Sequence, residues 1–226
     1  MSHIYTDGKL QYPSVTTILS EVMEEPPGIR HWKRKQRDPD RELTRRADIG
    51  TLMHYRILNN LAVQNLELPK GIPYQKWDND YLQRIELCED MFGQLDIEYG
   101  HPRKCEVTIF DRKNIYAGQY DLLAPMSING GKELLTIGDL KSSKAAYDKH
   151  KYQIGGYYHA IGRVPEQGVI ICLHPFEDGN PELVPRISLL TKAELDFYAD
   201  GFLEMVDKYY EKKGIKKNQR GRVNLN

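Results

Sequence analysis

The chain has 226 residues, which favours one large domain over two small ones. Its 32 Lys and Arg balance 32 Asp and Glu, so the net charge of +0 excludes strong overall attraction to nucleic acid and leaves that role to local patches. The three cysteines are isolated, which argues against structural zinc, an iron–sulfur cluster and a disulfide framework. No signal peptide or bilayer-length apolar run is found, so we expect no membrane partner and a reducing, cytoplasmic setting.

The chain is expected to start loosely, with one possible short strand within residues 1–12, and Ser14 is the predicted N-cap of the first helix. After a Pro-Pro-Gly break the sequence becomes basic and aromatic. Clustered cations beside an aromatic ring suit a phosphate backbone with a base or sugar on the ring, whereas the interleaved acids suit a solvated helix face. The residues predicted here to contact DNA are Arg30, Trp32, Lys33, Arg34, Lys35, Arg45 and Arg46.

Two helical stretches follow. Apolar residues recur at helical spacing from about residue 41 to 66, and an amphipathic helix is predicted from Trp77 to about Tyr99, with a loop between them. The first stretch carries Gly50 and His54, which are four residues apart and therefore on one face. His54 is either a ligand or an internally satisfied structural group.

The centre of the chain is rich in strand signals. Strands are predicted at residues 104–110, 115–124 and 134–141, with a turn after the first and a loop at 125–131 after the second. A three-stranded β-meander would bring Glu106, Asp121 and Asp139 into one sheet.

The last of these strands ends in an acid and a base. Side chains alternate along a strand, so Asp139 and Lys141 share one face and Leu140 points to the other. Such a pair is either a surface ion pair or the centre of metal-assisted hydrolysis. Ser142 and Lys144, which follow directly, are further predicted DNA contacts.

A helix at about residues 145–161, strands at 168–173 and 183–189, and a final helix opened by a capping box at Thr191 complete the chain. We therefore predict an α/β (α+β) fold with a central mixed sheet flanked by helices. The expected single domain spans residues 1–211, with a helical part at about 13–100, a core sheet at about 104–190 and a C-terminal helix at about 191–211. Residues 212–226 are expected to form a basic, mobile tail.

The motifs Gly50…His54, Glu106, Gly118-x-x-Asp121, Asp139-x-Lys141 and Gln153-x-x-x-Tyr157 occur in an order that resembles the PD-(D/E)XK nuclease superfamily. The resemblance is to its RecB-like branch, which includes CRISPR-associated and phage nucleases and the mitochondrial genome-maintenance exonuclease. It covers roughly residues 13–175 and implies a restriction-endonuclease-like core. The chain lacks the iron–sulfur cysteines that many of these nucleases carry.

The resemblance implies the metal ligands. His54 matches the motif histidine, and Asp121 matches the acid of the "PD" motif, although Tyr120 stands where the motif has proline. Asp139 matches the second acid, and the backbone carbonyl of Leu140 would be a further ligand.

It also implies the groups around the metal. Lys141 matches the catalytic lysine, and Glu106 matches an acid that reaches the metal through water. Gln153 and Tyr157 match a motif that would hold the phosphate or the lysine in place.

The residue types fit this chemistry on their own terms. Carboxylate oxygens suit Mg²⁺ or Mn²⁺, as one or two ions, and Lys141 would stabilise charge or, with a lowered pKa, deprotonate water. We therefore predict a metal-dependent deoxyribonuclease, more an exonuclease or single-strand and end-processing nuclease than a site-specific one, in replication, recombination or repair. The setting would be a prokaryotic cell or a virus in its host.

Other functions stay open from the sequence. The chain could be a nucleic-acid-binding accessory module with a degenerate site, a restriction enzyme, or an α/β domain whose acids are structural. No phosphate-binding loop is present, so a helicase, recombinase or replication partner would be a separate chain.

Overall fold

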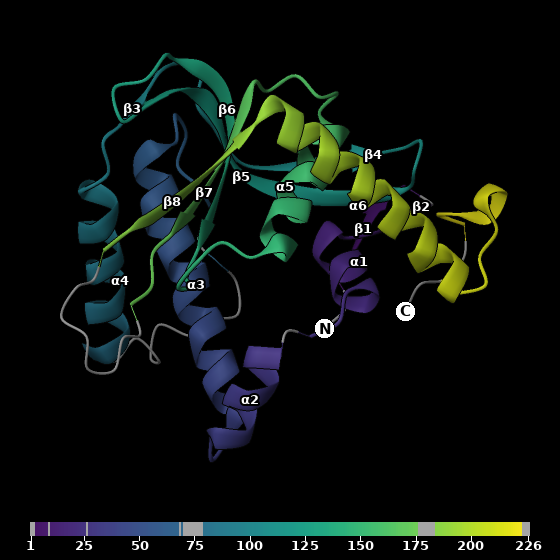
Figure 1. Cartoon of the computed structure of the whole chain (residues 1–226), viewed down its shortest axis with the longest axis horizontal. Coiled ribbons are helices and arrows are strands. Elements are labelled where there is room, and N and C mark those ends of the chain that lie inside the picture. The colour runs from purple at the N-terminus through teal and green to yellow at the C-terminus, as the bar shows by residue number, and fades with distance from the viewer. Residues whose placement is uncertain are drawn as a thin grey trace.

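A computed structural model of the chain shows a mixed six-stranded sheet with helices packed on both of its faces (Figure 1). It describes residues 3–8, 10–25, 27–67, 69, 79–175 and 184–222. Some predicted features lie outside these ranges. They are the start of the helix predicted at Trp77, part of the predicted loop before it, Leu183 and the last four residues. The predicted mixed α/β class is confirmed.

The sheet is organised around β5 (Tyr116–Ile128). β3 (Ile97–Tyr99) and β4 (Lys104–Asp111) pair with successive parts of one edge of β5, and β6 (Leu134–Lys141) pairs with the other edge, all antiparallel. The predicted meander of β4, β5 and β6 is therefore confirmed.

Two further strands extend the sheet beyond β6. β7 (Gln167–Cys172) runs parallel to β6, and β8 (Arg186–Thr191) runs antiparallel to β7. The parallel pair is joined by the helix α5 (Asp148–Ala160), which crosses over one face of the sheet.

One predicted loop is wrong in part, because β5 continues through Pro125 to Ile128. β4 pairs with β5 up to Leu123 and β3 begins pairing at Met126, so Pro125 lies where the edge passes from one short strand to the other. A proline has no N–H to donate, and this gap tolerates it within a strand. The Pro125 carbonyl still accepts a bond from Gly100 N–H at 2.8 Å.

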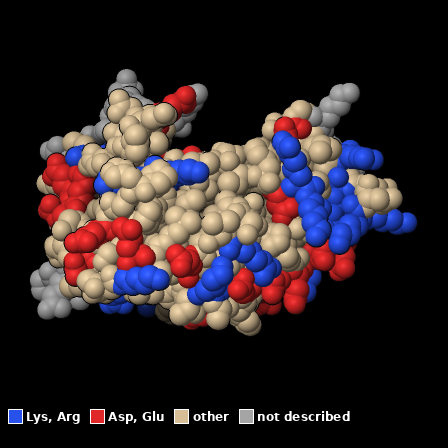
Figure 2. All heavy atoms as spheres, turned by 90° about the horizontal axis from the view of Figure 1, so that it is seen from above, with Lys and Arg blue, Asp and Glu red and all other residues tan. Residues whose placement is uncertain are grey.

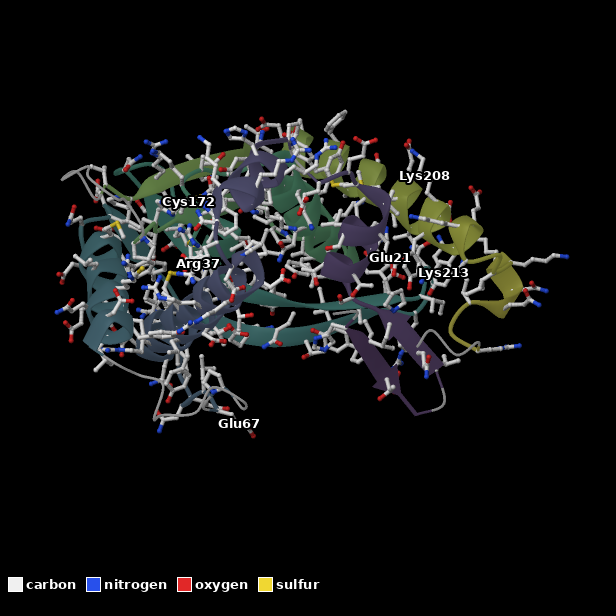
Figure 3. All side chains as sticks on the ribbon, turned by 90° about the horizontal axis from the view of Figure 1, so that it is seen from below. Glu21, Arg37, Glu67, Cys172, Lys208 and Lys213 are labelled. Atoms are coloured by element: carbon white, nitrogen blue, oxygen red, sulfur yellow. The ribbon has the colours of Figure 1, made fainter. Side chains whose placement is uncertain are left out.

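One face of the sheet carries α1 (Val15–Val22), α5 and α6 (Lys192–Lys212). α5 and α6 pack so closely that a Cβ on Gly155 would lie 2.5 Å from the backbone of Tyr198, which explains a glycine there. The end of α6 meets α1 through the ion pair of Lys213 with Glu21 at 3.1 Å (Figure 3).

The other face carries α3 (Pro39–Leu61) and α4 (Asn79–Gly93). Met53, Ile57 and Leu58 of α3 are buried against Leu122 and Leu140 of the sheet, among other residues. α2 (Pro27–Lys35) precedes α3, has no buried residue, and lies beside the N-terminal part of α3 in Figure 1.

Two predicted helix bounds are wrong. The helix expected to run to Tyr99 ends at Gly93, and Ile97–Tyr99 is strand β3, because its residues complete the edge of β5. The helix expected from residue 145 begins at Asp148.

Both ends of the described chain are packed more tightly than expected. β1 (Ile4–Asp7) and β2 (Leu10–Pro13) form a hairpin, and Gln11 N–H donates to the carbonyl of Gly221 at 2.9 Å. The expected mobile tail instead folds back through a short 3₁₀ helix (Lys217–Gln219) and buries Arg220 over the ring of Tyr210. Figure 2 shows the Lys and Arg side chains that gather at this end of the molecule.

None of the helices in the described ranges combines the length and the apolar character that crossing a bilayer requires.

Candidate metal centre

Three carboxylates lie in a row across the middle of the sheet. The pairs Cys105↔Leu122 and Val107↔Tyr120 flank Glu106 and Asp121, so these two acids stand opposite each other on β4 and β5. The pairing of β5 with β6 ends at Leu122↔Gly138, and Asp121 and Asp139 are the next residues along. Like charges directly opposite each other destabilise a sheet, so this row is unfavourable unless positive groups or protons offset its charge.

His54 joins this row from α3. Ligand atoms of His54, Glu106 and Asp121 all lie within 4.8 Å of one another, and His54 Nδ1 is 3.5 Å from Asp121 Oδ2. Burial of Met53 and Ile57 on either side fixes the helix face that carries the imidazole. Gly50, one turn earlier, lets Ser142 approach, since a Cβ there would lie 3.2 Å from Ser142 Oγ.

Glu106 has a strained backbone. Its φ of +53° is in the left-handed region, which is unfavourable for a residue with a side chain. Gln119, on the neighbouring strand, donates from Nε2 to the Glu106 carbonyl at 3.1 Å and also to its carboxylate. This contact holds the carboxylate in the group with His54 and Asp121.

Asp139 makes its contacts on the other side of the row. Its Oδ2 is 2.6 Å from Lys141 Nζ, and its Oδ1 accepts from Gln153 Nε2 at 3.2 Å. Gln153 also donates to the Tyr157 hydroxyl at 2.9 Å. Of the pair predicted to hold the phosphate or the lysine, Gln153 therefore contacts Asp139 directly and Tyr157 contacts it through Gln153. Tyr157 has room because residue 118 is glycine: a Cβ there would lie 2.5 Å from its ring.

The ionisation of these groups reflects an excess of negative charge. Burial, followed by the charge of Asp121, raises the pKa of Glu106 to about 7, and burial raises the pKa of Asp139 to about 6. Burial lowers the pKa of His54, but the Asp121 carboxylate outweighs it and the net pKa is raised. Burial likewise lowers the pKa of Lys141, and Asp139 outweighs it in turn, so the ammonium stays charged.

A divalent cation fits this donor set. Two carboxylates and an imidazole that converge on one point are ligands for Mn²⁺ and for Mg²⁺, and either ion would replace the protons that now offset the crowded charges. The sequence led us to expect Glu106 to reach the metal through a water molecule. Among the described residues, its carboxylate instead lies in the same converging group as His54 and Asp121. Asp139 as a ligand stays a prediction, as does the Leu140 carbonyl; the Leu140 N–H donates to Asp121 Oδ2 at 2.7 Å.

His54, Glu106 and Asp121 line an open cleft of about 930 Å³. β4 and β5 form its floor, α3 with the segment at Leu66 and Glu67 forms one side, and β1 with the start of α1 forms the other. In Figure 3 the labelled Glu67 and the β1–β2 hairpin both lie below the strands, near opposite ends of them.

The cations predicted to contact DNA differ in their surroundings, since some are paired with acids of the protein and others are exposed. Arg45 is paired with Glu42 and Asp80, and Arg46 is paired with Glu42 and lies over the ring of Trp32 at 5.1 Å. Lys33 pairs with Glu25 at 2.5 Å.

The remaining predicted contacts are in two places. Arg30, Arg34 and Lys35 are exposed on α2. Ser142 and Lys144 follow β6, where the Ser142 carbonyl lies 3.1 Å from His174 Nδ1.

Sequence reasoning missed Gln119 and the hairpin residues His3 and Tyr5, which also line the cleft. Gln119 lies within the Gly118-x-x-Asp121 motif, two residues before Asp121 and therefore on the same face of the strand, which is the only local signal it offers. His3 and Tyr5 are far along the chain from the nearest site residue, and only the folded hairpin brings them there.

Comparison with known proteins does not assign the chain to a family. No family model matches the sequence, and no curated protein matches it. Among solved structures, the chain is similar to one described as "Crystal structure of SSO0001", with 15% identity and a TM-score of 0.30. The match covers 55% of this chain and 58% of that one, so less than two thirds of that structure is spanned.

Proposed function

We propose that the protein is a metal-dependent deoxyribonuclease that acts on single strands or on the ends of DNA. The observation that carries this proposal is the row of Glu106, Asp121 and Asp139, with His54 and Lys141 at its sides. His54, Glu106 and Asp121 line an open cleft, and Asp139 and Lys141 lie directly behind them. Crowded carboxylates, a strained backbone and raised pKa values in one place are costly for stability, and such costs are typical of functional sites.

His54, Glu106 and Asp121 would hold the ion, with Asp139 as a further candidate. A bound Mg²⁺ or Mn²⁺ would supply Lewis-acid stabilisation of charge on the phosphate. The ammonium of Lys141 would stabilise charge that develops on the phosphate oxygens, because its raised pKa keeps it protonated. Gln153 would hold Asp139, and through it Lys141, in position.

The test is a cleavage assay on end-labelled linear, circular and single-stranded DNA with Mg²⁺ or Mn²⁺. We expect cleavage of linear or single-stranded substrates and a loss of about 10²-fold or more in Lys141→Ala and Asp139→Ala. Cleavage at wild-type rate by either variant would reject the site. A wild-type protein that binds DNA and never cuts it would support the accessory-module alternative instead.

A further inference from the structure

The hairpin side of the cleft presents a pair of stacked rings. His3, directly before β1, and Tyr5 of β1 have ring centroids 4.5 Å apart and planes inclined by 23°, and both line the cleft that contains Glu106 and Asp121. Burial, and after it the charge of Glu106, raises the pKa of Tyr5, so the phenol lies within electrostatic reach of the carboxylate row.

Backbone contacts hold this pair, while the His3 side chain is exposed and Tyr5 is half-buried. The His3 N–H donates to Thr17 Oγ1 at 2.9 Å, and the His3 carbonyl accepts from the Ser14 N–H at 3.0 Å, so the capped start of α1 fixes the strand. Tyr5 packs edge-on against Phe110 of β4, with centroids 6.1 Å apart. A surface fixed in advance loses little conformational entropy when a ligand stacks on it.

The chemistry of the cleft indicates what would stack there. The described residues that line it include aromatic rings and carboxylates but neither Lys nor Arg. A duplex offers a protein mainly its phosphates and groove edges, since each base face is covered by its neighbours. An unpaired base offers a free π-face, and aromatic side chains bind such faces without regard to sequence.

We propose that the His3–Tyr5 pair is a stacking platform for an unpaired base of a single-stranded nucleic acid, held beside the carboxylate row. The inference deepens the proposed nuclease function and rests on it for the class of substrate. It makes His3 and Tyr5 determinants of strand preference.

The test measures binding of a short fluorescent single-stranded oligonucleotide in Ca²⁺, with gels to verify that the strand stays intact. A second strand of equal length carries abasic sites in place of its bases. Tyr5→Ala should weaken binding of the normal strand by about tenfold, as expected when one base no longer stacks, and leave the abasic strand unchanged. His3→Ala should act in the same direction, and this side chain is exposed, so the fold tolerates its removal.

Two variants serve as controls. Tyr5→Phe keeps the ring and should bind like wild type. Phe197→Ala removes an exposed ring from α6, outside the residues that line the cleft, and should also bind like wild type.

DNA and RNA strands of one sequence should respond alike to Tyr5→Ala, because stacking does not depend on the sugar. Equal weakening of the normal and abasic strands, or no weakening in folded Tyr5→Ala and His3→Ala proteins, would overturn the platform.

Cleavage with Mg²⁺ or Mn²⁺ separates this inference from the function on which it rests. Base-dependent binding that disappears in Tyr5→Ala, without any cleavage by wild type, would uphold the platform and reject the nuclease. Cleavage whose preference for single strands survives in both hairpin variants would uphold the nuclease and reject the platform.

Discussion

Glu106 is the residue at which stability and function should be most clearly opposed. Its left-handed backbone and its position opposite Asp121 both cost free energy, and neither is needed to build the sheet. Glu106→Gly should therefore raise the free energy of unfolding by about 1 kcal/mol while it lowers affinity for Mn²⁺, because glycine adopts positive φ without strain.

Chemical denaturation and a Mn²⁺ titration would measure the two effects. Val107→Gly, at the next position of the same strand, is the matched control and should destabilise the protein, since Val107 packs on the core. A Glu106→Gly protein that is less stable than wild type would show that the strain is not stored at this residue.

Metal binding at this group should depend on pH. Glu106 has a pKa raised to about 7, Asp139 has one raised to about 6, and that of His54 is also raised, so these groups hold protons near neutrality that a cation must displace. Affinity for Mn²⁺ should rise between about pH 6 and pH 8, by up to about tenfold per pH unit for each proton released.

Calorimetric titrations in buffers of different ionisation enthalpy would count the protons released. An affinity that is constant across this pH range, with no proton release, would contradict the assignment of these groups as ligands.

Among the secondary structure elements, the turn between β4 and β5 shows how the strand that carries Asp121 is fixed to α5. Asp111, at this turn, accepts bonds from the N–H groups of Lys113 and Asn114 at 2.9 Å each, and its Oδ2 lies 3.0 Å from Nδ1 of His159 on α5. Although burial alone would raise the pKa of Asp111, the contacts with His159 and Asn114 lower it to about 2.

A folded-state pKa below the unfolded value means that the stabilisation is present above about pH 4 and disappears as the pH falls toward about 2. Asp111→Asn should therefore lower the free energy of unfolding by about 1–2 kcal/mol at about pH 6 and by progressively less below about pH 4. Urea unfolding at about pH 6 and about pH 3 would measure this, with Asp148→Asn, an exposed carboxylate, as the control. If Asp111→Asn lowered the free energy of unfolding equally at both pH values, the stabilisation could not come from the charge of the Asp111 carboxylate.

The elements that could be predicted from sequence are those with strong local signals. β6, with its apolar run before Asp139, and α6, with its capping box at Thr191, were predicted because each is specified within a few residues. Strand β3 and the extension of β5 past Pro125 were missed, because they depend on pairing between distant segments.

The residues of the candidate site likewise differ in whether the sequence could predict them. Residue types and spacing indicated the Asp139–Lys141 pair, and the resemblance of the ordered motifs to RecB-like nucleases added His54 and Asp121 to the expected site. The register that places Glu106 opposite Asp121 and the side chain of Gln119 on Glu106 come from tertiary structure alone.

At the scale of the whole molecule, the balanced net charge means that the proposed nucleic-acid substrate would have to be attracted by local patches. Arg34 and Lys35 of α2 are exposed, whereas Arg45 is neutralised within the protein by Glu42 and Asp80. The double substitution Arg34→Gln, Lys35→Gln should weaken DNA binding and reduce the salt slope by about 1 for each phosphate that the protein no longer neutralises.

Arg45→Gln is the matched control and should leave the salt slope unchanged, because its charge is already paired. Binding would be measured by anisotropy across a series of salt concentrations. A slope that falls with Arg45→Gln and not with the α2 variant would mean that the nucleic acid lies over α3 and α4 instead.

The central claim is that His54, Glu106 and Asp121 converge on one divalent cation. Anomalous diffraction from crystals soaked in Mn²⁺ tests it most directly. We expect an anomalous peak in contact with the imidazole of His54 and with carboxylate oxygens of Glu106 and Asp121, and no such peak in Asp121→Asn crystals. Well-ordered crystals that bind Mn²⁺ elsewhere, or that leave these three side chains without an ion, would contradict the account.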